Sequence, residues 1–165
     1  MTHAVDAFLV REMGRRCNYN REQLEHVRDL ILANANNITT NHNDTHFIEL
    51  AARNHQFLSL RGVEFITEES ILDFSSEYRA DLYQLILEIL MRPSFPILTV
   101  HDEFKCHANY VDDMRGTYMT ILAELADSRV GEQIIQEVRK DPSYRLEKFS
   151  ADLGGEIMQS EYFLS

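Results

Sequence analysis

The chain has 165 residues, 44% of them hydrophobic, which is enough for one domain with a buried core. Its formal net charge of −11 argues against nucleic-acid binding over a broad basic surface of this chain alone. The two cysteines lack CxxC spacing and give no disulfide framework, and we find no signal peptide and no run of eighteen apolar residues. We therefore expect a cytoplasmic protein that does not bind membranes.

Helical periodicity dominates the first ninety residues or so. The spacing of apolar residues predicts four helices, at 3–17, 21–35, 46–60 and 77–91. The run NANNITTNHND, residues 34–44, favours turns and is the best candidate for a linker. GVEFI at 62–66 is compatible with a short strand, and Pro93 ends the last of these helices.

Residues 97–107, ILTVHDEFKCH, predict a tight β-hairpin. Its first strand, 97–100, has the composition of a buried strand, and its second strand spans 104–107. Only three residues separate the two strands: His101, Asp102 and Glu103. Such a hairpin would carry Asp102 at its tip.

Three further helices are expected after the hairpin, at 110–126, 130–140 and 146–159. Asn109 is a plausible N-cap for the first of them, which has acidic residues in its first turn. The sequence thus predicts a mainly α protein with one small β-hairpin, an α+β fold, within a single domain over 1–165.

The hairpin is where metal chemistry is most plausible. A carboxylate held on rigid strands is suited to Mg²⁺, which requires oxygen ligands at strict geometry and takes only one or two of them from a protein. A solvated turn explains the same residues, because Asp is common in turns. The residues alone leave both interpretations open.

Three segments resemble one polymerase family. VHDEF resembles the palm hairpin of the single-subunit phage-type RNA polymerases and the related DNA polymerases, in which an apolar strand ends in His-Asp. THAVDAFLVREM is similar to the palm helix that precedes this hairpin in the RNA polymerases, which opens with a His followed three residues later by an Asp. SEYFLS resembles the short acidic and aromatic tail of those enzymes.

The resemblance implies that the chain is the C-terminal part of a phage-type DNA-directed RNA polymerase. It assigns 1–17 to a palm helix, 18–96 to a helical insertion, 97–107 to the catalytic hairpin and 108–165 to C-terminal helices and the tail. In that family a second metal-binding Asp and the fingers lie upstream of the palm helix. We therefore expect a fragment or subunit of a split enzyme that works with a larger chain, in the host cytoplasm if it is viral, and is inactive alone.

Individual roles follow from the resemblance. Asp102 would ligate the catalytic Mg²⁺, His101 would support the hairpin near the growing 3′ end, and His3 matches a family His close to the nascent base pair. Nucleoside triphosphates, the DNA template and the RNA product would reach this site through the complex. The role of Glu103 is open, because a Glu at this position is found in the DNA polymerases, whereas the RNA polymerases often carry another residue.

Two surface features complete the candidate site. Arg11 and Arg15 lie four residues apart on one helix face and are candidates for contact with a nucleic-acid phosphate, although a solvated face explains the pair as well. The tail, which includes Phe163 and Ser165, is expected to pack back against the body, and the resemblance implies that it lies near the active centre. Simple hydrophobic closure is the other explanation for Phe163.

Three alternatives stay open. A fragment of a related DNA polymerase shares the His-Asp hairpin. A metal-dependent phosphohydrolase with a His-Asp doublet would also use the cluster His42, Asp44 and His46, but such enzymes carry the doublet on helices. A catalytically silent interaction module is the third alternative.

Overall fold

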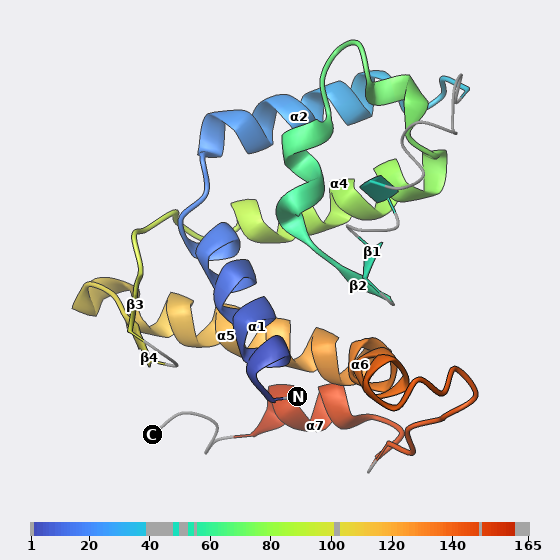
Figure 1. The fold of residues 1–165 in the computed structure, drawn as a ribbon. Helices are drawn as coiled ribbons and strands as arrows, with labels where there is room; N and C mark the ends of the chain where they lie inside the picture. Colours follow the sequence, from blue (N-terminus) through green and yellow to red (C-terminus); the bar gives the residue numbers. More distant parts are fainter. Residues whose placement is uncertain are drawn as a thin grey trace. The chain divides into compact units, whose positions relative to one another are not determined.

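The structure is a computed structural model, and it describes residues 2–38, 48–49, 53–54, 56–100, 103–148 and 150–160 (Figure 1). The fold is mainly helical with small two-stranded sheets, which confirms the predicted fold class. The long helices are α1 (Thr2–Cys17), α2 (Arg21–Ala33), α4 (Ser76–Leu90), α5 (Val111–Asp127) and α6 (Val130–Arg139). The remaining elements are α7 (Leu153–Gln159), the strands β1 (Arg53–Asn54), β2 (Phe57–Leu58), β3 (Leu98–Val100) and β4 (Glu103–Lys105), and 3₁₀ helices at Leu60–Phe65, Ile71–Asp73 and Ala108–Tyr110.

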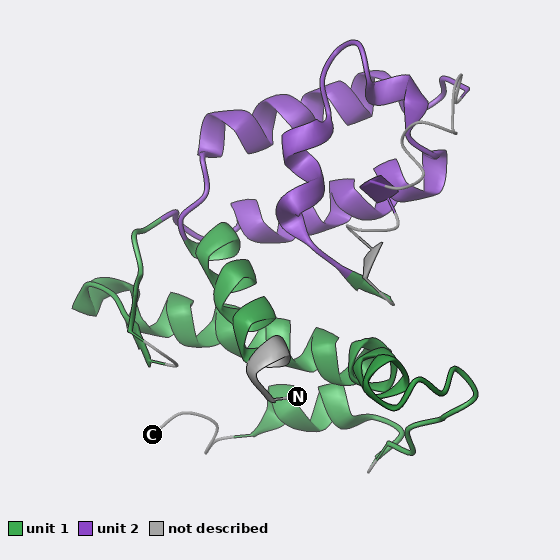
Figure 2. Ribbon diagram, viewed as in Figure 1, with its two compact units in different colours: residues 1–17, 55–57, 95–165 green, residues 18–54, 58–94 purple. Residues whose placement is uncertain are grey.

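The chain forms two compact units, which Figure 2 colours separately. Unit 1 consists of residues 1–17, 55–57 and 95–165, and unit 2 of residues 18–54 and 58–94. The chain therefore passes from unit 1 into unit 2 directly after α1 and returns directly before the hairpin, with a brief return at 55–57.

Unit 2 is built on α2 and α4, whose apolar stripes share one core. Both helices begin at side-chain caps, since the side chain of Asn20 accepts a hydrogen bond from Gln23 N and that of Ser75 from Tyr78 N. The two stripes supply most of the buried residues of this core, namely Leu24, Val27, Ile31, Tyr78, Leu82, Leu85, Ile86 and Ile89. Spacing of three and four residues places each set on one helix face.

Two predictions within unit 2 are wrong. The helix expected over 46–60 is replaced, among its described residues, by a short helical piece at 48–49 and by β1 and β2. The strand expected at 62–66 lies mostly within a 3₁₀ helix, Leu60–Phe65, whose start is capped by Ser59 accepting a hydrogen bond from Arg61 N. The cap at Ser59 favours a 3₁₀ helix for this short apolar run. Periodicity alone cannot distinguish a strand from a helix over so few residues.

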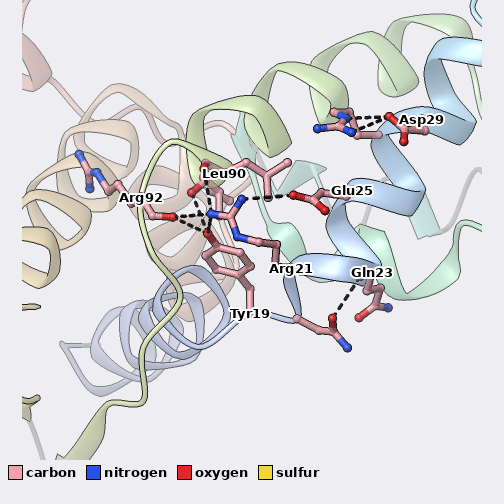
Figure 3. A network of polar contacts seen from close by, with 10 residues as sticks. Tyr19, Arg21, Gln23, Glu25, Asp29, Leu90 and Arg92 are labelled. Carbon is pink, nitrogen blue, oxygen red and sulfur yellow. Dashed lines mark hydrogen bonds and ion pairs between the residues drawn. The ribbon is translucent and has the colours of Figure 1, made fainter.

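The two ends of unit 2 are joined by a polar network (Figure 3). The hydroxyl of Tyr19 donates to the carbonyl of Arg92 at 2.5 Å, and the guanidinium of Arg21 donates to the carbonyls of Leu90 and Arg92 at 3.1 and 3.2 Å. Ser94 Oγ donates to the carbonyl of Tyr19 at 2.6 Å. These bonds satisfy carbonyls at the C-terminal end of α4 and hold the first and last residues of the unit together.

Unit 1 packs α1, α5, α6, α7 and the β3–β4 hairpin around its own core. The buried apolar side chains of this core are Leu9, Met13, Cys17, Phe57, Phe95, Ile121 and Val130. The left-handed residue Lys140, with φ 53°, ends α6. The helix α7 begins at Leu153, so the prediction of a helix from 146 is wrong for the described residues 146–148 and 150–152. Leu146 N instead donates to the carboxylate of Glu132.

The start of α5 also differs from the prediction. Tyr110 is the N-cap of α5 and makes no capping bond through its side chain. Asn109 lies in the preceding 3₁₀ helix, and the side chain of His107 accepts a hydrogen bond from Asn109 N. The N-cap prediction for Asn109 is therefore wrong, because a 3₁₀ helix capped by His107 precedes α5 and makes Tyr110 its N-cap.

Candidate metal-binding hairpin

The predicted hairpin is present as the antiparallel pair β3–β4. Its register pairs Leu98 with Lys105, Thr99 with Phe104 and Val100 with Glu103. The prediction that Glu103 lies in the connection between the strands is wrong, because Glu103 is the first residue of β4. His101 and Asp102 lie between the two strands in sequence and fall outside the described residues.

One side of the hairpin is attached to α5 through an aromatic pair. The ring of Phe104 meets that of Tyr118 edge to face, with ring centroids 5.8 Å apart. β3 is not buried as predicted, since the side chains of Leu98 and Val100 are exposed, at 60% and 41%. The hairpin packs one face of its two-stranded sheet against α5, through Phe104. Among the described elements, none buries the side chains of β3 on the other face.

The segment that leads into β3 is fixed to the end of α1. The amide of Phe95 donates to the carbonyl of Cys17 at 2.8 Å, and the fully buried ring of Phe95 stacks on Tyr110 with ring centroids 4.8 Å apart. Phe95 thus ties α1, the start of the hairpin and the entry to α5 together within unit 1. A carboxylate carried by this hairpin would have a rigid base.

A buried ion cluster fastens α1 to α5. Arg16 donates to Glu12 on its own helix at 3.1 Å and makes two bonds to Glu124 on α5, at 2.9 and 2.7 Å. Glu12 is fully buried, and the guanidinium of Arg16 also lies over the ring of Phe57 at 5.2 Å. Burial opposes the charge on Arg16, but the hydrogen bonds and charges of Glu124 and Glu12 outweigh it and raise the pKa of the guanidinium.

The candidate residues of α1 have different surroundings. His3 lies in α1, and its side chain is outside the described part. Arg11 is exposed, whereas Arg15 is partly buried and pairs with Glu12 at 3.4 Å. Arg11 is therefore the better placed of the two for contact with a phosphate, because the charge of Arg15 is already balanced within the helix.

Other candidates fall outside the described residues. These are His42, Asp44 and His46 of the Asn-rich run, and the tail residues Phe163 and Ser165. Among the residues that the structure does describe, no group of three or more His, Cys, Asp and Glu side chains is arranged to hold a metal ion.

Sequence reasoning missed four residues that hold the helices around the hairpin together: Glu12, Arg16, Glu124 and Phe57. The buried pair of Glu12 and Arg16 has a signal in the sequence, because carboxylate and guanidinium four residues apart meet on one helix face. The bond from Arg16 to Glu124 spans 108 positions and has no such signal. Phe57, which completes the core beneath α1, lies in a stretch whose periodicity favoured a helix.

Neither a scan against protein-family models nor a search of curated proteins found a match to this chain. Within the described residues, no helix combines the length and the apolar character that a membrane crossing requires.

Proposed function

We propose that this chain is the C-terminal part of a phage-type DNA-directed RNA polymerase and supplies one metal-binding carboxylate, Asp102, for two-metal nucleotidyl transfer. A larger chain supplies the second metal-binding Asp and the fingers. In this complex Asp102 would hold Mg²⁺ together with the second Asp, and the ions would supply the charge that activates the attacking oxygen and stabilises the leaving phosphate. The complex works on a DNA template in the cytoplasm, that of the host cell if the chain is viral.

The observation that carries the proposal is the register of the hairpin. Val100 and Glu103 face each other as the last pair, and the sequence puts His101 and Asp102 between them. A two-residue connection is the shortest common link between antiparallel strands, and few turn types fit it. Catalysis by two metal ions would require the carboxylate of Asp102 to be held in place, because such ions lie about 3.5–4 Å apart.

A second support is the anchoring of α1 within unit 1. The bond from Phe95 to Cys17 joins the end of α1 to the start of the hairpin, and Arg16 joins α1 to α5. In the proposed enzyme this anchoring keeps His3, at the start of the same helix, at a constant distance from the hairpin. His3 and His101 then act as positioning residues beside the nascent base pair, and Asp102 acts on the metal.

The exposed side of the hairpin is suited to the larger chain. Leu98 and Val100 place two apolar side chains in water on a strand next to the proposed metal ligand. Full burial of an exposed side chain of this kind is worth roughly 1.5–3 kcal/mol, and burying the exposed 60% of Leu98 and 41% of Val100 against a partner would contribute a corresponding fraction to assembly. The same contact would bring the carboxylate of the partner close to Asp102.

A related DNA polymerase is the second candidate, and Glu103 favours it. Glu103 directly follows the His-Asp doublet and begins β4, where it pairs with Lys105 at 3.2 Å on the surface. The two candidates differ in the sugar of the substrate. Extension with ribonucleotides alone supports the RNA polymerase, and extension with deoxyribonucleotides alone supports the DNA polymerase.

The function can be tested by extension of a primed DNA template. The 165-residue chain alone is expected to be inactive, and the chain assembled with the larger polypeptide is expected to extend the primer in the presence of Mg²⁺. Robust extension by the chain alone would contradict the proposal. Hydrolysis of a nucleotide by the chain alone would favour the phosphohydrolase, and an assembled complex without activity would favour the silent interaction module.

A further inference from the structure

Unit 2 carries a surface cavity between its two long helices. The cavity has a volume of about 210 Å³ and lies between the C-terminal half of α2 and the N-terminal half of α4. Its walls include Ile31 and Leu32 from α2 and Ala80 and Tyr83 from α4. Leu32 is 59% exposed although it is apolar, so the cavity continues into an apolar rim.

The size of the cavity limits what it can bind. Sites for drug-sized ligands usually measure about 300–1,000 Å³. This cavity is smaller and suits one large apolar side chain, such as Leu or Phe. A groove between two antiparallel or crossing helices commonly takes an amphipathic helix that inserts such anchors.

The net charge of unit 2 indicates the charge of the partner that would bind it. Residues 18–54 and 58–94 carry 12 Asp and Glu and 6 Arg, with no Lys, which gives a net charge of −6. Several of these arginines already have partners. Arg79, which lines the cavity, is buried and donates to backbone carbonyls. Arg21 pairs with Glu25 and Arg28 pairs with Asp29 (Figure 3). Unit 2 as a whole is therefore acidic, although the cavity wall itself contains the cation Arg79.

Carboxylates lie near the groove on both helices. Glu88 follows Ala80 and Gln84 at four-residue spacing, which places it along the same face of α4 as the cavity. On α2, Asp29 lies one turn before Leu32, is exposed at 63% of its side chain and pairs with Arg28 at 2.8 Å. A basic helix seated in the groove would meet Glu88 on one side and would share Asp29 with Arg28 on the other.

We propose that the cavity between α2 and α4 is a docking site for a basic amphipathic helix of a partner protein, with one Leu or Phe side chain seated between Leu32 and Ala80. The negative surface disfavours nucleic acid and anionic lipid, and the charge of −11 disfavours a second copy of this chain. The inference does not depend on the polymerase activity, because it concerns unit 2 alone.

The test uses the full chain and a labelled 14-residue helical peptide of Leu and Lys, followed by fluorescence anisotropy. We expect binding of this peptide and none of its analogue with Glu in place of Lys, because unit 2 is acidic and Glu88 lies beyond the apolar rim on the same face of α4. Ala80→Phe fills the cavity from an exposed wall position and should weaken binding about tenfold or more. Ala33→Phe, on the same helix as Leu32 but not in the cavity wall, is the matched control and should bind as the natural chain does.

Charge is tested separately from shape. Glu88→Lys should weaken binding and reduce its dependence on salt, whereas Glu68→Lys, in the turn at 67–70, should change it little. Circular dichroism checks that all variants keep their helices. Equal binding of the Lys and Glu peptides, unchanged binding by Ala80→Phe, or no binding at millimolar peptide would each overturn the proposal.

Discussion

The ring of Phe57 meets the ring of Phe8 edge to face, with centroids 4.9 Å apart. Phe8 belongs to α1 in unit 1, and Phe57 comes from the short return at 55–57 in the middle of the segment that otherwise forms unit 2. Phe57 is fully buried and also lies beneath the guanidinium of Arg16. The core of unit 1 is therefore incomplete without a residue from the middle of the chain.

Phe57→Ala should lower the free energy of unfolding by about 3–5 kcal/mol, because it leaves a cavity under α1 and removes the aromatic pair. Urea unfolding followed by circular dichroism measures the change. Phe65→Ala is the control, since Phe65 is 37% exposed, and it should cost clearly less. A small effect at Phe57 would mean that it does not belong to this core.

Arg16→Met should destabilise the chain by up to about 3–5 kcal/mol, because the fully buried Glu12 loses its partner at 3.1 Å and keeps the pair with Arg15 at 3.4 Å. Arg11→Met, on the exposed side of the same helix, should stay within about 0.5 kcal/mol. The double variant Glu12→Leu with Arg16→Met should recover part of the loss, because it removes the buried charge as well. If the loss in the double variant equals the sum of the losses in the two single variants, Glu12 and Arg16 do not stabilise the chain as a pair.

The acid stability of unit 1 should depend on Glu132. The hydrogen bond from Arg129 and the backbone amide of Leu146 hold the pKa of this carboxyl below its ordinary value of 4.5. A carboxyl with a lowered pKa in the folded state stabilises the fold above its ordinary pKa, and this stabilisation is lost as the pH falls through the folded value. Glu132→Gln should therefore lower the melting temperature near neutral pH and flatten its decline below about pH 4.5. Parallel curves for the two proteins between pH 3 and 7 would show that Glu132 does not contribute.

The exposed strand β3 gives a prediction about assembly. Leu98→Ser should change the stability of the chain by no more than about 0.5 kcal/mol, because the side chain is 60% exposed. In the proposed complex the same change should weaken association with the larger chain by roughly tenfold or more, measured by calorimetry. Thr99→Ser, on the same strand, is the control. An unchanged affinity of Leu98→Ser for the larger chain would show that β3 does not lie in the interface between the two chains.

Much of the helical framework could be predicted from the sequence. The helices α1, α2, α4 and α5 begin and end within two residues of the predicted positions, because apolar spacing and local caps such as Ser75 both act over a few residues. The hairpin could be predicted for the same reason, since β-branched residues and a short polar connection lie next to each other in the chain.

Long-range packing explains most of what could not be predicted. The apolar residues of 46–60 have the spacing of a helix. In the structure, however, Phe57 is buried in the core of unit 1 and lies in the short strand β2. The exposure of β3 depends on which element covers each face of the hairpin, and composition does not contain that information. The bond between Arg16 and Glu124 likewise joins residues whose proximity depends on the packing of α1 against α5.

The role of Asp102 is tested most directly in the assembled enzyme. Asp102→Asn removes the charge that would bind Mg²⁺ at nearly constant shape, and nucleotide addition by the complex is measured at saturating substrate and Mg²⁺. The account predicts that addition falls by several orders of magnitude while the complex still forms and melts at the same temperature. Glu103→Gln, at the neighbouring exposed position, is the matched control and should retain most of the activity of an RNA polymerase. Elongation by Asp102→Asn at a rate close to that of the natural chain would contradict the assignment of Asp102 as a catalytic metal ligand.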